Sequence, residues 1–510
     1  MHAIVRSGCI IGMDARHIDV EVDVSGGLPS FSVVGLPDTA IRESRDRIRS
    51  AIKNAGFQFP HQKITVNLSP AELKKEGAGF DLPIALGILA ATGHIEVNSL
   101  IDKIFCGELS LNGSLKNFRG ALPLAIALKD NFDTFILPSA NSREASHIKD
   151  ISVYGAHSLR EVVEHLKGTK PIHKSPHSPR TEANTSSRSK FDFKDVKGQE
   201  HIKRGLEIAA SGGHNILLLG PPGSGKSMLA KRFPTILPNM QIDEAMETTK
   251  IYSVAGQLRS DNLMVERPVR SPHHTISYAA MAGGGSIPRP GEISLAHNGV
   301  LFLDEFPEFR RDVLETLRQP LESGDITITR SASSLRYSSR FILIAAMNPC
   351  PCGYFTDPHK QCSCSPAQIQ RYLSKISGPL LDRIDIHLEV PRLNYNDLSR
   401  KRTGETSEKI KERVISTRKL QNERYKEITD HPPYNAYISS KETENYCGLS
   451  DEAKELLKSA ILELGVSARA YDKILKVART ISDMEASEII GAHHISEAIG
   501  YRCLDRNLWV

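Results

Sequence analysis

Asn215-Ile-Leu-Leu-Leu-Gly-Pro-Pro-Gly-Ser-Gly-Lys-Ser227 joins a short apolar run to a glycine-rich turn. The spacing Gly220-x-x-x-x-Gly225-Lys226-Ser227 is that of a P-loop that follows a buried strand. In such a loop the glycines let backbone N–H groups turn toward the phosphates of a nucleotide, the lysine reaches the β- and γ-oxygens, and the serine hydroxyl binds Mg²⁺. A glycine turn without a ligand would explain neither Lys226 nor Ser227. We therefore predict an ATP site formed by Gly220, Pro221, Pro222, Gly223, Ser224, Gly225, Lys226 and Ser227.

Composition indicates an ordinary globular chain. The 510 residues are 40% hydrophobic and 25% charged, and at about 150 residues per domain they suffice for several domains. The net charge of +5 permits an acidic polymer as a partner but does not require one. No apolar run reaches the roughly 18 residues of a membrane span, and the first residues lack the pattern of a signal peptide. Eight cysteines in so long a chain do not indicate a disulfide framework, so we expect a cytoplasmic protein.

Two further apolar runs end in polar residues. Gly299-Val-Leu-Phe-Leu-Asp304-Glu305 is typical of a Walker B strand, in which Asp304 would hold Mg²⁺ through water and Glu305 would polarise the attacking water. Phe341-Ile-Leu-Ile-Ala-Ala-Met-Asn348 ends in an amide, which matches the sensor-1 element that orients this water in AAA+ ATPases. Strands with solvated polar ends are the alternative for both runs. The order of P-loop, acidic strand and Asn-tipped strand favours an ATPase.

Several motifs together resemble one family. Val196-Lys-Gly-Gln199, Asn298–Phe306, Ala346–Gly353 and Gly378–Asp385, with the P-loop, are similar to those of magnesium-chelatase-like AAA+ ATPases. Within this class the chain resembles, over nearly its whole length, the ComM/YifB competence-protein group. The resemblance implies a hexameric ATPase that acts on single-stranded and branched DNA. It also implies that the ring drives branch migration of recombination intermediates during natural transformation, with other recombination proteins as potential partners.

Two arginines take expected roles from this resemblance. Arg383 lies between two acids in Leu381-Asp-Arg-Ile-Asp385, where ring-shaped ATPases carry an arginine finger for the neighbouring subunit's γ-phosphate. A salt bridge with Asp382 or Asp385 in the same subunit is the alternative. Arg469, in Ser467-Ala-Arg-Ala-Tyr471, matches the sensor-2 position, and a charge at the start of a surface helix is its alternative. Both are therefore candidate catalytic residues beside Glu305 and Asn348.

Residues 1–167 combine strand and helix patterns, so we expect an α+β or α/β domain there. Lys75–Leu82 and Gly107–Gly113 resemble stretches of the Lon-protease-like, ribosomal-S5-type fold. Gly79 stands where the nucleophilic serine would be, and Ala121-Leu122-Pro123 where the lysine base would be. The domain is therefore expected to be proteolytically inactive. Expected strands are Ile18–Val24, Phe31–Val34, Lys63–Leu68, Ile104–Leu109 and Thr134–Leu137, and expected helices are Thr39–Ala55 and Pro83–Ala91.

The rest of the chain divides by composition into three parts. Residues 168–190 are rich in Pro, Ser and basic side chains and read as a linker. Residues 191–395 would form an α/β AAA+ core, with helices over Glu200–Ala210 and Met228–Phe233. Residues 396–510 would form a helical lid. Its expected helices are Glu405–Lys426, Ser450–Leu464 and Ser467–Glu485.

Two excursions from the core are candidates for DNA contact. Ser271–Gly285 is uncharged and looks like the helix-2 insertion of the family. A β-hairpin is expected to start at Asp325–Arg330 and return at Arg340, with a turn over Ser331–Ser339. In related helicases both project into the pore, where arginines would grip phosphates without reading sequence. The candidate DNA-binding residues are Arg330, Arg336 and Arg340, and a solvated hairpin surface is the alternative.

Four cysteines cluster after Asn348. Cys350-Pro-Cys352 and Cys362-Ser-Cys364 supply two pairs of thiolates, which suit a tetrahedral zinc ion. The C-x-C spacing is less common than C-x-x-C, His359 is a competing ligand, and reduced thiols in a tight loop are the alternative. Such a site would be structural, because four thiolates leave no open position.

Three other functions are alternatives to an ATP-driven DNA translocase, which is the activity that the family resemblance implies. A chelatase-type subunit that remodels a protein or drives metal insertion is the alternative, although that motor lacks a Lon-like domain. A protease lacks its serine and lysine here. A non-enzymatic adaptor would not need Lys226, Asp304 and Glu305 together.

Overall fold

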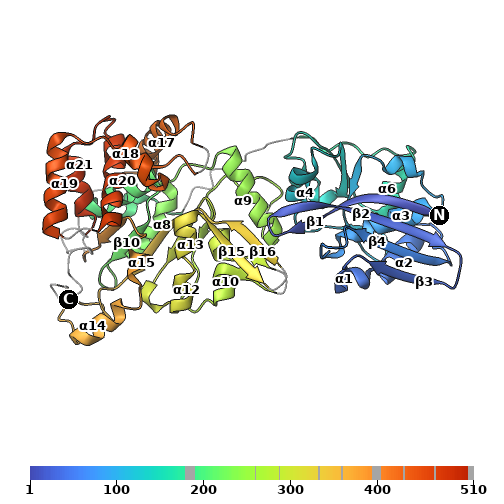
Figure 1. The fold of residues 1–510 in the computed structure, drawn as a ribbon, viewed down its shortest axis with the longest axis horizontal. Helices are drawn as coiled ribbons and strands as arrows, with labels where there is room; N and C mark the ends of the chain where they lie inside the picture. Colours follow the sequence, from blue (N-terminus) through green and yellow to red (C-terminus); the bar gives the residue numbers. More distant parts are fainter. Residues whose placement is uncertain are drawn as a thin grey trace. The chain divides into compact units, whose positions relative to one another are not determined.

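The computed structural model describes residues 1–177, 190–258, 260–285, 288–330, 333–355, 357, 360–392, 404–428, 431–464 and 467–502. They form two compact units (Figure 1). The first comprises Met1–Asn184, Gln241–Val265 and Thr329–Tyr337, and the second Thr185–Met240, Glu266–Ile328 and Ser338–Val510. Among the described residues, no helix has both the length and the apolar composition needed to cross a bilayer.

The first unit is built on a seven-stranded mixed sheet in the order β3-β4-β2-β1-β5-β8-β9. Helix α3 (Asp81–Ala91) is buried along its whole length and packs on β1 and β2. The close packing requires a glycine, because a Cβ at Gly87 would lie 2.5 Å from Cγ2 of Val22. The strands are β1 (His2–Ile11), β2 (Asp14–Ser25), β3 (Ser30–Val34), β4 (Lys63–Ser69), β5 (Lys103–Phe105), β8 (Thr134–Pro138) and β9 (Ser152–Ala156).

Most elements expected in the first unit are confirmed, but two of them are divided and several further elements were not predicted. The helix expected over Thr39–Ala55 is divided at Glu43 into α1 (Thr39–Arg42) and α2 (Ser44–Asn54). The strand expected over Ile104–Leu109 is divided into β5 and β6 (Glu108–Leu109), and β6 pairs with β7 (Leu115–Lys116) in a separate small sheet. Strands β1 and β9 were not predicted, nor were the remaining helices of this unit; in β1 the apolar residues do not alternate strictly. The remaining helices are α4 (Ala121–Leu128), α5 (Ser139–Ala145) and α6 (Leu159–Leu166).

The two stretches that resemble Lon-type proteases lie side by side. The N–H of Gly107 donates to the carbonyl of Gly79 (2.8 Å), and the N–H of Leu82 donates to the carbonyl of Gly107 (3.0 Å). No side-chain hydroxyl stands at Gly79.

Helix α9 (Ile242–Ala255) follows the P-loop in sequence yet belongs to the first unit. It packs on α4, and its Ser253 hydroxyl donates to the buried carboxylate of Glu144. That carboxylate also accepts from the N–H of Leu122 (3.0 Å), and burial raises its pKa. The ammonium of Lys250 lies 3.0 Å from Asp14. A helix that follows the P-loop in sequence is thus tied to the first unit by packing on α4 and by polar contacts.

The second unit is built on a five-stranded parallel sheet in the order β11-β14-β17-β10-β18. Its central strands are apolar and buried, as expected of a parallel sheet covered on both faces. Helix α7 (Glu200–Gly212) packs against β18. The strands are β10 (Ile216–Leu219), β11 (Val269–Arg270), β14 (Val300–Leu303), β17 (Ile342–Met347) and β18 (Ile386–Glu389).

The C-terminal part is helical, as predicted. Helix α20 packs against α7, α17 and α21, and its buried Arg479 pairs with Asp483. The helices are α17 (Ser407–Arg424), α18 (Ser440–Tyr446), α19 (Asp451–Leu464), α20 (Ala468–Met484) and α21 (Ala492–Gly500). Shorter elements of the second unit are α8 (Lys226–Arg232), α10 (Tyr278–Ala282), β12 (Gly283–Gly284), β13 (Arg289–Pro290), α11 (Glu292–Leu295), α12 (Arg311–Glu315), α13 (Arg318–Ser323), α14 (Pro366–Leu373) and α15 (Gly378–Leu381).

The expected hairpin is present with a shorter turn. Strand β15 (Asp325–Arg330) pairs with β16 (Ser333–Ser338), so the turn predicted over Ser331–Ser339 is wrong. The serines suggested a turn, but Tyr337 is buried and its neighbours are more exposed, which is the alternation of a strand.

Candidate nucleotide site

The P-loop, the acidic pair and the Asn-tipped strand meet at one edge of the parallel sheet. Leu219 of β10 stands opposite Met347 of β17, and Leu303 of β14 stands opposite Ala345 of β17. The residues that follow these strands therefore emerge together at the carboxyl end of the sheet, where ligands bind in open α/β sheets.

Lys226 connects two of these loops. Its buried ammonium donates to the carbonyls of Gly220 (2.7 Å) and Pro221 (3.0 Å) and to Oδ1 of Asn348 (3.0 Å). Burial lowers the pKa of Lys226 to about 8, and the nearby carboxylate of Asp304 opposes this shift. The ammonium of Lys226 is thus in direct contact with the side-chain amide of Asn348, the predicted sensor-1 residue.

Ser227 and Asp304 form the second contact of the site. The Ser227 hydroxyl donates to Oδ2 of Asp304 (2.6 Å), and Oδ1 accepts from the N–H of Glu305 (3.0 Å). A hydroxyl beside a carboxylate is an oxygen donor set that suits Mg²⁺. The two residues predicted to bind Mg²⁺ are therefore adjacent and chemically suited to it.

The backbone of the P-loop needs its glycines. Gly225 has φ of +97°, a left-handed conformation that strains other residues, and a Cβ at Gly220 would collide with the carbonyl of Val390. The amide of Gln199 donates to the carbonyl of Ser224 (3.0 Å), so the Val196–Gln199 motif braces the loop.

Glu305 has an unusual backbone and a neighbour that the sequence analysis missed. Its φ is +53°, and such non-glycine residues cluster at functional sites. Nδ1 of His274 lies 3.1 Å from its Oε2. In the sequence, two adjacent histidines directly after a short strand could have marked this position as functional. The sequence did not indicate that His274 would contact Glu305.

Comparisons with known proteins agree with this arrangement. Residues 192–398 match the profile described as magnesium chelatase, subunit ChlI, residues 20–141 match subunit ChlI of Mg-chelatase, and residues 404–502 match its C-terminal part. Competence protein ComM of Haemophilus influenzae is 45% identical over 508 residues, covering 99% of this chain and 98% of the relative. The chain belongs to the ComM/YifB family.

Two other relatives differ in how much of the chain they match. The uncharacterized protein YifB of Escherichia coli is 43% identical over 507 residues, covering 99% of this chain and 98% of the relative. The magnesium-chelatase 38 kDa subunit of Rhodobacter capsulatus is 25% identical over 183 residues, covering 32% of this chain and 51% of the relative. The likeness to ComM and YifB thus extends over the whole chain, whereas the likeness to that chelatase subunit covers a third of it.

In this ComM/YifB protein, Arg383 and Arg469 line a common cavity of about 450 Å³. Arg383 forms an ion pair with Glu322 and donates to the carbonyl of Pro379 (2.6 Å). Arg469 lies 3.4 Å from a carboxylate oxygen of Asp382. No P-loop residue is among those that line this cavity, so the structure places the two arginines together and apart from their own chain's P-loop. An ion pair within the subunit, the alternative expected for Arg383, is present, but with Glu322.

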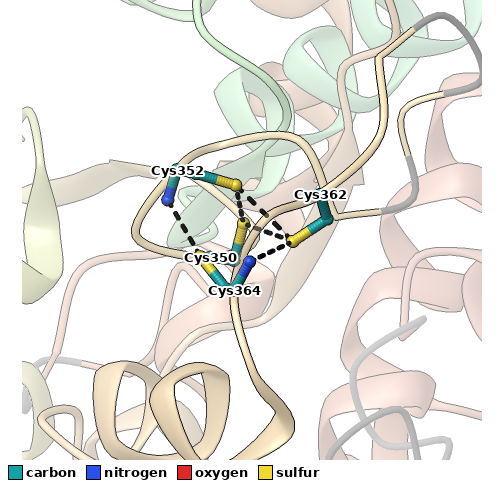
Figure 2. Close-up of side chains that lie close together, drawn as sticks. All are labelled: Cys350, Cys352, Cys362 and Cys364. Atoms are coloured by element: carbon teal, nitrogen blue, oxygen red, sulfur yellow. Dashed lines mark hydrogen bonds between the residues drawn. The ribbon is translucent and has the colours of Figure 1, made fainter.

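The four predicted cysteines converge (Figure 2). Their sulfur atoms all lie within 4.8 Å of one another. The N–H groups of Gly353 (3.2 Å) and Phe355 (3.3 Å) donate to Sγ of Cys350. Backbone N–H groups, first that of Tyr354, lower the pKa of Cys352 to about 5. Four sulfurs supported by amide donors suit a tetrahedral soft-metal ion such as zinc. His359, the competing ligand, lies outside the described residues.

The cysteine loop also contacts the P-loop. A Cβ at Gly353 would lie 2.5 Å from Cδ of Pro222 and 3.8 Å from Cγ of Asn348. A metal clip at this position would therefore stabilise one wall of the nucleotide site.

A second metal-like cluster, Glu485 with His493 and His494, is explained by hydrogen bonds. Nδ1 of His494 accepts the N–H of Gly491 (2.9 Å), so the ring proton of the neutral imidazole is on Nε2, 3.1 Å from the Glu485 carboxylate. In this tautomer Nε2 of His494 carries a proton and offers no lone pair to a metal ion.

The candidate DNA-binding arginines differ in their surroundings. Arg336 on β16 is exposed. Arg340 is half-buried, and its backbone is held by the N–H of Asn298 (2.6 Å) and by Nδ1 of His297 (3.1 Å). The side chain of Arg330 lies outside the described ones.

Proposed function

We propose that this protein is an ATP-dependent, hexameric DNA translocase of the cytoplasm that promotes branch migration during recombination in natural transformation. The observation that carries the ATPase part is the chain of contacts from Asn348 through Lys226 and Ser227 to Asp304. The 45% identity to Competence protein ComM supports a role in competence.

The site residues divide the work of hydrolysis. Lys226 exchanges its carbonyl partners for the β- and γ-phosphate oxygens of ATP, and its contact to Asn348 keeps the sensor amide at the γ-phosphate. Ser227 and Asp304 would hold Mg²⁺, which when bound neutralises charge on the phosphates. Glu305 polarises the attacking water and takes up its proton, with Asn348 orienting that water.

The place of the arginines favours a ring. Because Arg383 and Arg469 share a cavity apart from their own P-loop, both are suited to reach the γ-phosphate held by a second copy. Their partners Glu322 and Asp382 keep the guanidinium groups oriented in the single chain. The site is thus complete only with a neighbouring subunit.

Three further assignments complete the proposal. Arg336, with Arg330 and Arg340, grips the DNA backbone through charge, without reading sequence. Cys350, Cys352, Cys362 and Cys364 would hold a structural zinc ion that supports the loop beside Pro222 and Asn348. The first unit is a Lon-like scaffold without proteolytic activity, since it lacks a serine at Gly79 and a lysine at Ala121–Pro123.

The test is ATP hydrolysis with and without single-stranded and branched DNA, for the wild type and Glu305→Gln. We expect DNA to stimulate the wild type and Glu305→Gln to bind ATP without turnover. If the protein hydrolyses ATP but neither binds DNA nor is stimulated by it, the result would favour the chelatase-type alternative. In that alternative the motor remodels a protein or a metal-insertion complex. In that case Arg336→Ala would also have no effect.

A further inference from the structure

The carboxylate of Glu305 lies beside the imidazole of His274. The Glu305 side chain is 58% exposed, and its Oε2 lies 3.1 Å from Nδ1 of His274, a salt-bridge separation when the imidazole is protonated. An exposed glutamate otherwise samples several rotamers, only some of which point at an attacking water.

The imidazole is itself held in place. The ring centroid of His273 lies 4.1 Å from that of His274, and the ring of Phe309 is nearly perpendicular to that of His274, with the two centroids 6.4 Å apart. Nδ1 of His273 lies 2.9 Å from Oγ1 of Thr275, which restrains the first ring in turn. His274 is therefore a packed side chain that can impose its direction on a more mobile one.

The backbone explains why these two residues meet. Strand β11 pairs in parallel with β14, with Arg270 opposite Leu301, so the segments that follow the two strands leave the sheet at the same edge. The guanidinium of Arg270 makes two 2.6 Å hydrogen bonds to Glu292 and fixes the end of β11. His274 follows four residues later, and Glu305 follows β14 directly.

We propose that His274 is a positioning residue for Glu305. The imidazole fixes one carboxylate oxygen, so that the other is presented to the water that attacks the γ-phosphate. His274 itself transfers no group to the substrate. The inference rests on the proposed ATPase function, and it assigns a role that neither the P-loop nor the Walker B motif contains.

The test compares His274→Ala and His274→Gln with the wild type in steady-state ATP hydrolysis. We expect His274→Ala to lower kcat by roughly tenfold, as for misplacement of a catalytic group, with KM for ATP changed less than twofold. His274→Gln keeps a donor and should recover part of the lost rate. In a Glu305→Gln background, His274→Ala should add nothing, because the carboxylate that it positions is gone.

A matched control is available in the same unit. Nε2 of His493 lies 3.1 Å from the Glu485 carboxylate, the same separation, on the surface of α21. His493→Ala should leave kcat unchanged, and thermal unfolding of all variants would verify that they fold.

The outcomes are distinguishable. A kcat of His274→Ala equal to or above that of the wild type, or a loss confined to KM, would overturn the positioning role while the ATPase stands. A further loss in the Glu305→Gln background would equally contradict it. If the wild type itself hydrolyses no ATP, the proposed function fails instead.

Discussion

Gly353→Ala tests whether the cysteine loop supports the nucleotide site. The new methyl group would lie 2.5 Å from Cδ and 2.6 Å from Cγ of Pro222 in the P-loop. Carbon atoms in contact are normally about 3.5–4.0 Å apart, so either Pro222 or the cysteine loop must shift by about 1 Å.

The magnitude follows from two terms. Gly353 has φ of +84°, and a left-handed conformation costs an alanine about 1–2 kcal/mol. Overpacking in a close-packed region adds about 1–3 kcal/mol. Suppose that a shift of Pro222 relieves about 1.4 kcal/mol of this cost in the ATP-free protein. ATP binding must then restore the original position of Pro222 against that free energy, so the affinity for ATP falls about tenfold.

The assay is the Kd for ATP, measured with the zinc content and the thermal unfolding of the same samples. Gly168→Ala is the matched control, since Gly168 has φ of +71° and its Cβ would meet no atom within 4 Å. Gly168→Ala should lose a similar amount of folding stability, because alanine is strained in a left-handed conformation, and it should keep the wild-type affinity for ATP. Wild-type ATP affinity together with wild-type zinc content in Gly353→Ala would refute the mechanical link between the two loops.

Three further predictions address the same site. Because the pKa of Lys226 is lowered to about 8, the ammonium loses its proton as the pH rises through 8, and the affinity for ATP should fall between pH 7 and 9. Lys226→Arg should remove this pH dependence, because a guanidinium stays protonated in this range. Equilibrium binding of ATP between pH 7 and 9 would measure both effects. Elemental analysis should find one zinc per chain, and Cys350→Ser or Cys362→Ser should abolish it and lower the unfolding temperature; full metal content in either variant would contradict a four-thiolate site. Arg383→Ala and Glu305→Gln chains should each be nearly inactive alone but regain ATPase activity when mixed. Some interfaces of a mixed ring combine an intact Arg383 from one subunit with an intact Glu305 from its neighbour. If verified mixed rings show no recovery, the neighbouring subunit does not supply the arginine.

Local signals in the sequence sufficed to predict the three strands that lead into the candidate nucleotide site. The P-loop, Asp304-Glu305 and Asn348 each follow a short apolar run, and the structure confirms these runs as β10, β14 and β17. Such signals are readable because a buried parallel strand and the loop after it are contiguous in sequence. The family resemblance rested on the same motifs and is confirmed along the whole chain.

Where the signal was mixed, the prediction was less accurate. Strand β1 lacks the strict alternation that predicts a strand, and the small polar residues of β16 are typical of a turn although they form a strand. Hydrophobic periodicity reports how one segment is buried, and it weakens where a strand is buried unevenly or carries serines.

From the sequence alone, then, come the strands of the candidate nucleotide site, their order along the chain, the helical C-terminal part and the four cysteines of the candidate metal site. Only the tertiary structure decided that α9 folds with the first unit, that Arg383 and Arg469 share one cavity and that His274 faces Glu305. Each of these depends on which distant segments pack together. Pairing across a fold is set by sheet register and by the burial of complementary surfaces, and neither is written in any single stretch of the chain.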